Sequence, residues 1–465
     1  MFMSKLNYNK TLKVGVYLDQ LALPIDPSNN PNLTNAFFSN NLYSNLVDVD
    51  ENNNYTNELV SKYWFETEAN KLYFEFKNSR VSAEDAAFSL KRLIMQNRQL
   101  HTDFWNIICK HGEAPRNCAD RIYVENKNLV IHYDDAVKST YIIPTLASVD
   151  YKIIPLAAFD SNDLDTAKIV NYKLTSGYYH LEVRDSKYFF VKNSNSLQNI
   201  YNEYELINAN ANSILEDSFV EQIDILSTTV VLQNSAYQKL IEKNWNIFKT
   251  HNISILMLIF SKNGISKTTV AERFNVAQRL VKESLNLVQL VNSKRTIEFF
   301  QEYGQGFLTQ AQRAEIEDLR NQATPMLQKK IIYGTWVPQK WSSFAQNNSD
   351  IVIVENKTFQ MNMKEEDQPD MFIISNDVSF DLNLSLISYA ANVGLLSMTK
   401  SQVDYFAGLS NELEKIEYLN AIHFKTLKEC KIYPMVSSPY HTAFNGKFEH
   451  NLSKFNSRTL LWKIH

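Results

Sequence analysis

Side chains that could do chemistry occur in this sequence, but they are not grouped as catalysis requires. Adjacent carboxylates include the pairs Glu84-Asp85, Asp134-Asp135 and Glu365-Glu366. Sequence neighbours point apart on a strand or a helix, so the two carboxylates of such a pair do not face one substrate. The sequence also lacks a GxSxG nucleophile turn, an HExxH helix and a Walker-type phosphate loop. We therefore expect a protein that is not an enzyme.

The cysteines leave two alternatives open. Cys109 and Cys118 bracket the turn-like segment KHGEAPRN, and they could form a disulfide in an oxidising compartment or remain two loop thiols. Cys430 is left over, and we expect it to be buried near a strand. Three scattered cysteines and nine histidines without an i, i+4 pair provide no set of metal ligands. The sequence predicts neither a metal site nor a cofactor.

Length and charge describe a folded protein of several domains. A chain of 465 residues exceeds one ordinary core, so two or three domains are expected. The net charge of -4 gives no general attraction to nucleic acid or to anionic membranes. The longest apolar run, residues 253–260, is too short to span a bilayer and is typical of a buried strand. The first ten residues, MFMSKLNYNK, contain no apolar stretch of a secretory signal.

Residues 41–95 contain three dissimilar elements in a defined order. The sequence predicts a short helix over residues 41–47, then an acidic, Asn-rich turn, then a strand over residues 71–76 with alternating apolar side chains. A helix should begin after Ser82, because Ser82 and Asp85 have the spacing of a capping box. Mixed strand and helix patterns recur in both halves of the chain, which favours an α/β architecture.

This order of elements resembles the family 5 extracellular solute-binding proteins, the peptide and nickel receptors of ABC importers. AEDAAFSLKRL, which begins at Ala83, is similar to the family's "tAeDvafSlkRl". Ile25-Asp26-Pro27 resembles its "LDP" turn, and residues 175–179, TSGYY, resemble "GTGPY". VAERFNVAQRLVKESL from Val270 and IYPM from Ile432 stand where the family has "vRqAlnyAiDr" and "iiPly". The resemblance spans nearly the whole chain.

The resemblance implies a two-lobed, periplasmic-binding-protein-like α/β fold of type II, with an extra subdomain inserted in the first lobe. The first lobe would comprise residues 1–38, 169–250 and 432–465. The inserted subdomain would comprise residues 39–168, and the second lobe residues 251–431. Helical stretches are expected over residues 267–305 and 309–321 of the second lobe. Two hinge strands would lie near residues 252–255 and 432–435.

The resemblance also implies where a ligand binds. In the family an extended peptide pairs through its backbone with strand-like segments of both lobes, and an aspartate of the second lobe holds its amino terminus. Asp377 occupies that anchor position, flanked by Ser375, Asn376 and Val378. Asp381 is a rival, and Asp377 could instead cap a turn. On the first lobe Leu21, Ala22 and Leu23 would offer main-chain contacts, and Tyr178 would lie near a hinge.

These implications define the expected function and partners. We expect a monomeric receptor that captures an oligopeptide or dipeptide by hinge closure and delivers it to the membrane subunits of an ABC permease, without nucleic acid. Such receptors act in the periplasm or at the cell surface, so a signal peptide would have been removed. Alternatives are a cytoplasmic ligand-sensing or interaction protein with the same fold, or a receptor for a nickel chelate or a sugar.

Overall fold

The computed structural model divides the chain into two compact units. Unit 1 contains residues 1–250 and 441–465, and unit 2 contains residues 251–440. The structure describes residues 8–465 except for 30–31, 53, 78–79, 97–107, 109–112, 134–138, 149–150, 195–199, 252–253, 288–291, 293, 297, 299–300, 303–304, 307, 326–330, 336–350, 356–368, 378–404, 407–408, 410, 447 and 455–457.

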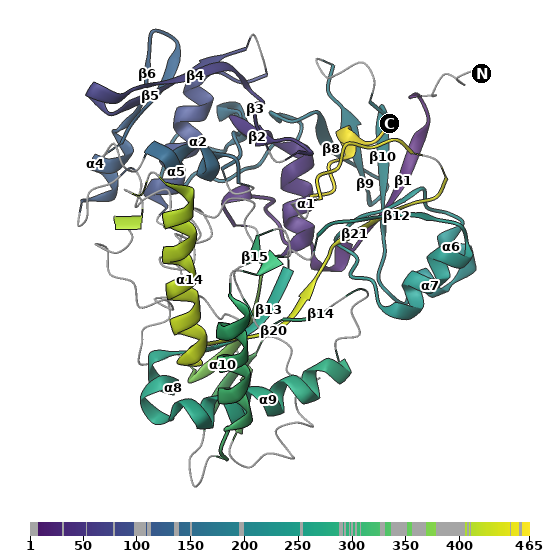
Figure 1. The fold of residues 1–465 in the computed structure, drawn as a ribbon. Coiled ribbons are helices and arrows are strands. Elements are labelled where there is room, and N and C mark those ends of the chain that lie inside the picture. The colour runs from purple at the N-terminus through teal and green to yellow at the C-terminus, as the bar shows by residue number, and fades with distance from the viewer. Residues whose placement is uncertain are drawn as a thin grey trace. The chain divides into compact units, whose positions relative to one another are not determined.

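The main sheet of unit 1 contains seven strands in the order β12-β21-β11-β1-β10-β9-β8 (Figure 1). The central strand β1 runs parallel to both of its neighbours, β10 and β11, and the outer pairs are antiparallel. The strands are β1 (Thr11–Val16), β8 (Tyr179–Arg184), β9 (Lys187–Lys192), β10 (Glu203–Asn208), β11 (Ile225–Leu226), β12 (Asn246–Lys249) and β21 (His441–Phe444). Two short helices of this unit are α6 (Asp217–Val220) and α7 (Asn234–Glu242).

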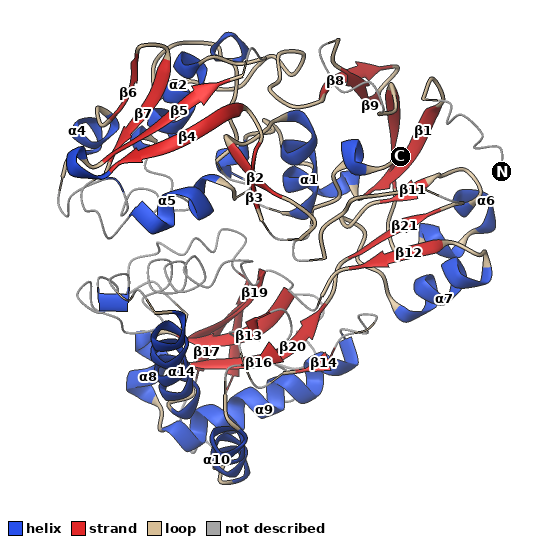
Figure 2. Ribbon diagram, turned by 45° about the horizontal axis from the view of Figure 1, so that its top comes forward, coloured by secondary structure: helices blue, strands red, loops and turns tan. Residues whose placement is uncertain are grey.

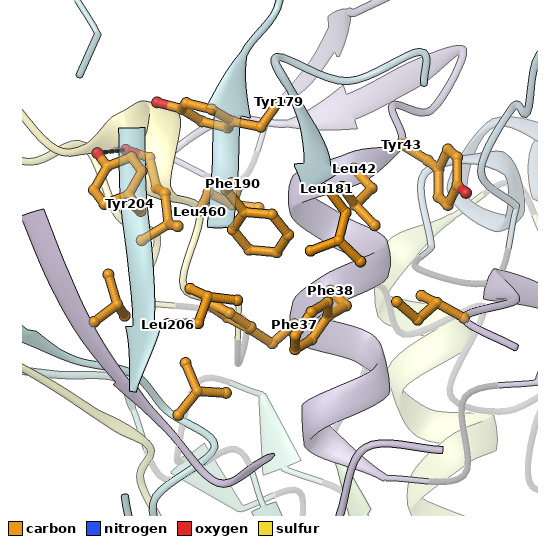
Figure 3. Close-up of a cluster of buried hydrophobic side chains, with 14 of the residues drawn as sticks. Phe37, Phe38, Leu42, Tyr43, Tyr179, Leu181, Phe190, Tyr204, Leu206 and Leu460 are labelled. Atoms are coloured by element: carbon orange, nitrogen blue, oxygen red, sulfur yellow. Dashed lines mark hydrogen bonds between the residues drawn. The ribbon is translucent and has the colours of Figure 1, made fainter. Parts of the chain in front are cut away.

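Helix α1 (Leu33–Leu42) packs against this sheet through aromatic side chains. Figure 3 shows Phe37 and Phe38 of α1 facing Phe190 of β9. The ring centroids of Phe38 and Phe190 lie 5.2 Å apart, and those of Phe37 and Phe190 lie 5.8 Å apart. Such large apolar side chains, removed from water, are the main source of stability in this core.

A second sheet in unit 1 has four antiparallel strands in the order β4-β5-β7-β6, and α2 (Ala83–Met95) packs against it (Figure 2). Its strands are β4 (Val60–Glu66), β5 (Lys71–Phe76), β6 (Ile122–Glu125) and β7 (Asn128–His132). The strand predicted over residues 71–76 is confirmed, and so is the capping box of Ser82 and Asp85. Helices α4 (Pro115–Ala119) and α5 (Ser139–Leu146) and the hairpin of β2 (Val47–Val49) and β3 (Tyr55–Asn57) complete this region.

The short helix predicted over residues 41–47 is wrong, because α1 ends at Leu42 and β2 begins at Val47. Tertiary partners take the polar groups that a helix would have used. Ser44 forms a bridge with Ile153, and its N–H donates to Ser176 Oγ over 2.9 Å. Asn45 Nδ2 donates to the Leu146 carbonyl over 2.8 Å. These distant contacts hold the segment extended against its local helical pattern.

A buried ion pair joins two of the segments that carried the family resemblance. Asp26 of the IDP turn pairs with Arg92 of α2, and both side chains are almost fully buried. Arg92 Nε also donates to the Ala167 carbonyl over 3.0 Å, and Ser28 donates to Asp26 through its N–H and its hydroxyl. Because both charges are paired and hydrogen-bonded, the burial is tolerated. The pair therefore fixes α2 against the segment that follows β1.

Gly177, in the segment that resembles "GTGPY", lies against the end of α1. Its N–H donates to the Leu42 carbonyl over 2.8 Å. A Cβ at this position would lie 2.6 Å from the same oxygen, closer than van der Waals contact allows. Only glycine permits this approach without displacing the backbone, which explains the glycine of that segment.

Unit 2 is built on a sheet in the order β14-β20-β13-β19-β17-β18. Its strands are β13 (Ser254–Phe260), β14 (Lys294–Arg295), β17 (Ile331–Thr335), β18 (Ile351–Glu355), β19 (Met371–Asp377) and β20 (Ile432–Ser438), and β15 (Gln301–Glu302) pairs with β16 (Gln305–Gly306). Helices α8 (Lys262–Lys267), α9 (Val270–Leu287), α10 (Gln310–Asn321) and α14 (Glu412–Lys428) belong to this unit.

Two sequence predictions for this half of the chain differ from the structure. The long helix expected over residues 267–305 is interrupted, because α9 ends at Leu287 and β14 follows at Lys294. The second helix, after the Thr309 cap, is confirmed as α10. Residues 432–440, which the prediction gave to the first lobe, lie in unit 2, because β20 pairs along its length with β13. The chain returns to unit 1 at His441.

Candidate functional site

The segment of residues 21–23, predicted to contact a ligand through its main chain, is clamped by two asparagines of unit 1. The Ala22 N–H donates to Asn35 Oδ1 over 3.0 Å, and Asn35 Nδ2 donates to the Ala22 carbonyl over 2.7 Å. Asn32 Nδ2 donates to the Gln20 carbonyl over 2.7 Å. Asn32 is also the N-cap of α1, so the first turn of that helix sets the position of the segment.

The clamp distinguishes Ala22 from its two neighbours. Both main-chain polar groups of Ala22 are satisfied within the unit by Asn35. The Leu21 N–H donates to the Leu18 carbonyl over 2.9 Å. No hydrogen bond between described residues uses the Leu21 carbonyl or the main chain of Leu23, and the Leu23 residue is 63% exposed. The groups of this segment that are open to a partner are therefore on Leu21 and Leu23.

The predicted anchor segment forms the end of β19 in unit 2. Ser375, Asn376 and Asp377 are opposite Leu256, Ile255 and Ser254 of β13, respectively. Val378 and the rival Asp381 lie outside the described residues. Ser254 is also opposite Ser438 of β20, so Asp377 shares a register row with the start of β13 and the end of β20. This row is close in sequence to the two connections between the units, because Ser254 follows the connection at 250–251 and Ser438 precedes the one at 440–441.

Tyr178 has a packing role that the sequence did not show. Its ring centroid lies 4.7 Å from that of Trp462, and the Arg80 guanidinium lies 4.5 Å from the Tyr178 ring. Burial, together with the nearby Glu58 carboxylate, raises the pKa of the Tyr178 phenol. The ring is half-buried between these side chains. Tyr178 thus connects the segment after Gly177 with the C-terminal segment of the chain.

The structure describes two of the three cysteines. Cys118, in α4, is disulfide-bonded, and Cys430 is a free, buried thiol whose pKa burial raises to about 12. Cys109 lies outside the described residues. Among the residues that the structure describes, no group of histidine, cysteine, aspartate or glutamate side chains could hold a metal ion. The described helices include none that is long and apolar enough to cross a membrane.

Sequence reasoning missed a cluster of charged side chains inside unit 1. Asp48 of β2 and Arg458 form an ion pair of 2.8 Å, and Arg458 Nη2 also donates to the Ala147 carbonyl over 2.7 Å. Lys152 and Lys463 act electrostatically on Asp48. Burial opposes ionisation of Asp48, but Arg458 and the two lysines outweigh it and hold the pKa of that carboxyl below its usual value.

Lys152 is the unusual member of this cluster. It is 5% exposed and follows Tyr151 in the apolar run YKIIP, which is the one sequence signal that could have drawn attention to it. Burial, reinforced by repulsion from Arg458 and Lys463, lowers the pKa of Lys152 to about 7. Nearby, burial and the charge of Asp48 raise the pKa of Glu58, which accepts a hydrogen bond of 3.1 Å from Ser44 Oγ.

No protein-family model matches the chain, and no curated protein sequence matches it. Solved structures do resemble it. A dipeptide binding protein from Pseudoalteromonas sp. SM9913, in complex with Met-Leu, has a TM-score of 0.71 at 13% identity, over 98% of this chain and 100% of that one. The Escherichia coli murein tripeptide binding protein MppA has a TM-score of 0.71 at 14% identity, over 99% of each chain.

A third solved structure, NikA from Brucella suis in complex with Fe(III)-EDTA, has a TM-score of 0.69 at 12% identity, over 98% of this chain and 100% of that one. At these identities the likeness concerns the fold. It confirms the predicted α/β fold of the two-lobed periplasmic-binding-protein type.

Proposed function

We propose that this chain is a family 5 solute-binding protein, a non-enzymatic receptor that captures a peptide for an ABC importer. The observation that carries the proposal is the likeness, over nearly the full length of the chain, to a dipeptide binding protein and to a murein tripeptide binding protein. The sequence motifs agree with it, because Asp26 and Arg92, which stand in two of them, form one buried ion pair.

The open main-chain groups at residues 21–23 support a peptide as the ligand. In a parallel ladder, one residue of a strand donates its N–H to a carbonyl of the neighbouring strand, and its own carbonyl accepts from the N–H two residues further along that strand. The Leu21 carbonyl and the Leu23 N–H have this spacing. An extended peptide would pair with these two groups while Asn35 holds Ala22 from the other side. Such pairing does not depend on the peptide's side chains, so selectivity would come from pockets and end charges.

Asp377 is proposed to hold the peptide's amino terminus. A carboxylate that meets an ammonium group away from water forms a short, charge-assisted hydrogen bond. Ser375, Asn376 and Val378 would provide neighbouring polar and main-chain contacts. Asp377 lies in the register row of Ser254 and Ser438, which are close in sequence to the two connections between the units. This position is compatible with a mechanism in which bound ligand favours closure of the two units about those connections.

The remaining features of the proposal follow from this receptor role. The protein would act as a monomer in the periplasm or at the cell surface, with ABC permease subunits as partners. The disulfide of Cys118 favours an oxidising compartment over the cytoplasmic alternative, and we propose Cys109 as its partner. A non-peptide ligand is the second candidate, favoured by the likeness to a protein bound to Fe(III)-EDTA. A sugar is a further alternative.

Native mass spectrometry after incubation with a mixed peptide pool tests the proposal. Retention of free-amino di- to oligopeptides by the wild-type protein is the expected result. Retention of metal chelates or sugars alone would remove peptides as the ligand class. A decrease in radius of gyration on adding a retained peptide, measured by small-angle X-ray scattering, would support closure, and an unchanged radius would contradict it.

A further inference from the structure

Strand β4 is an edge of the four-stranded sheet in unit 1 (Figure 2). After a register shift between Val60 and Lys62, residues 62–66 form a regular ladder with β5 on one side. Apart from that ladder, no hydrogen bond between described residues uses the main chain of residues 62–66. Alternate N–H and C=O groups of an edge strand point away from its sheet, so β4 can accept another strand.

The middle of this edge strand consists of three consecutive aromatic residues. Trp64 is 37% exposed on one face of the sheet. Tyr63 and Phe65 are half-buried on the other face, where Tyr63 packs against Phe74 and Phe65 against Tyr133. An apolar edge of this kind readily pairs with another chain unless charges prevent it. The charges on β4 therefore decide what can pair with it.

Those charges lie on the same face as Trp64, one row before it and one row after it. Lys62 is opposite Glu75 of β5, and their side chains form an ion pair of 3.0 Å. Glu66 is opposite Lys71 of β5. The Lys62 side chain is 61% exposed, and Glu66 is exposed as well, so each can meet a further charge across the open edge.

The order of the charges along β4 is complementary to itself. In an antiparallel pair of two β4 strands centred on Trp64, Lys62 of each copy lies opposite Glu66 of the other. The charges of one row would then alternate across four strands, in the order Glu75, Lys62, and then Glu66 and Lys71 of the second copy. A parallel pair would place lysine opposite lysine and glutamate opposite glutamate, which is unfavourable.

The aromatic residues match in the same antiparallel register. Trp64 already stacks on Tyr73 of β5, with ring centroids 5.1 Å apart and an angle of 3° between the ring planes. Trp64 of the second copy would extend this stack across the edge. On the other face, Tyr63 of each copy would lie opposite Phe65 of the other. Such aromatic pairs are favourable beyond the area that they bury.

We propose that β4 is a docking surface for a second copy of this chain, whose own β4 adds antiparallel to it and joins the two sheets into one. Both copies use the same surface, so the assembly closes at a dimer. The contact is small, so dilute protein would remain the monomer proposed above and dimers would form as the concentration rises. The inference is independent of the ligand that the receptor binds.

Sedimentation equilibrium of the full chain over a range of concentrations tests the docking surface. We expect the wild type to dimerise reversibly. Lys62→Glu and Glu66→Lys each replace both attractive pairs across the edge by like charges, so each should weaken dimerisation at least about tenfold. Lys168→Glu, which reverses an exposed lysine elsewhere in unit 1, should dimerise as the wild type does.

Restoring the opposite charges separates complementarity from damage to the strand. Dimers should return in the double variant Lys62→Glu/Glu66→Lys, and also in an equimolar mixture of the two single variants, which carry two glutamates and two lysines at these positions. Recovery in either case supports the docking surface, and failure of both would overturn it. So would single variants that dimerise like the wild type, or a wild type that stays monomeric up to about 0.5 mM.

A cysteine at the centre of the pair tests the register and does not depend on the charge variants folding. Directly opposite residues of antiparallel strands have Cα atoms about 4.5 to 5.5 Å apart, which permits a disulfide between the two copies. Mild oxidation should therefore link Trp64→Cys chains into covalent dimers. Tyr73→Cys, one strand further from the edge, should remain unlinked, and equal linking of the two variants would contradict the register.

Discussion

Replacement of Lys152 by methionine should change how stability depends on pH. The pKa of this lysine is about 7 in the folded protein, against a value of 10.5 for an unperturbed lysine. Between these values the unfolded chain binds more protons than the folded one, so the contribution of Lys152 to the free energy of unfolding rises with pH. Below about pH 7 both states are protonated, and the full cost of burying the charge is present.

The size of the effect follows from the pKa difference. Each pKa unit corresponds to about 1.4 kcal/mol, so from pH 7 to pH 9.5 the lysine should add about 3 kcal/mol to the stability of the wild type. Methionine fills a similar volume without a charge, so Lys152→Met should lack this increment. The difference between the two proteins isolates the lysine, because other groups that titrate in this range are common to both.

The assay is urea unfolding of both proteins at several pH values, without sulfate or phosphate. We expect the wild type to gain about 3 kcal/mol relative to Lys152→Met over the window from pH 7 to pH 9.5. Lys168→Met, which removes an exposed lysine of the same unit, should follow the wild type. A constant difference in the free energy of unfolding between wild type and Lys152→Met across the window would refute the lowered pKa of Lys152 in the folded protein.

Three further predictions concern the contacts that shape unit 1. Arg92→Leu should destabilise the unit by about 3 to 5 kcal/mol because it leaves Asp26 buried without its partner, and in urea unfolding the cost should be smaller when Asp26→Asn is also present. Gly177→Ala should cost about 1 to 3 kcal/mol because its Cβ would collide with the Leu42 carbonyl, and an unchanged melting temperature would contradict that geometry. Asn35→Ala should lower peptide affinity about tenfold, seen by calorimetry, because binding must then order residues 21–23, whereas unchanged affinity would show that the clamp is irrelevant to binding.

Elements with strong local signals could be predicted from the sequence. The strand over residues 71–76 and the Ser82 capping box are set by alternation and cap chemistry within a few residues, and both are confirmed. The helix predicted over residues 41–47 failed because Ile153 and Ser176, more than a hundred residues away, take the polar groups of Ser44. Local pattern contains no record of such partners.

The same distinction applies to the candidate site. The family resemblance predicted residues 21–23 as ligand contacts. It could not predict that Asn35 of α1 uses both main-chain polar groups of Ala22 and leaves those of its neighbours open. The charged cluster could not be predicted, because Asp48, Lys152 and Lys463 are far apart in sequence and meet only in the folded unit. The one local sequence signal of the cluster was the presence of Lys152 within an apolar run.

Peptide binding to the wild type and to Asp377→Asn, measured by isothermal titration calorimetry, tests the central claim most directly. A peptide retained from the mixed pool should bind the wild type, and Asp377→Asn should weaken it by about 2 to 5 kcal/mol, the usual loss when a buried charged pair loses one member. The N-acetylated form of the same peptide should bind weakly to both proteins. Equal affinity of the wild type for free and acetylated peptide would contradict the anchor, and failure to bind any peptide would contradict the receptor.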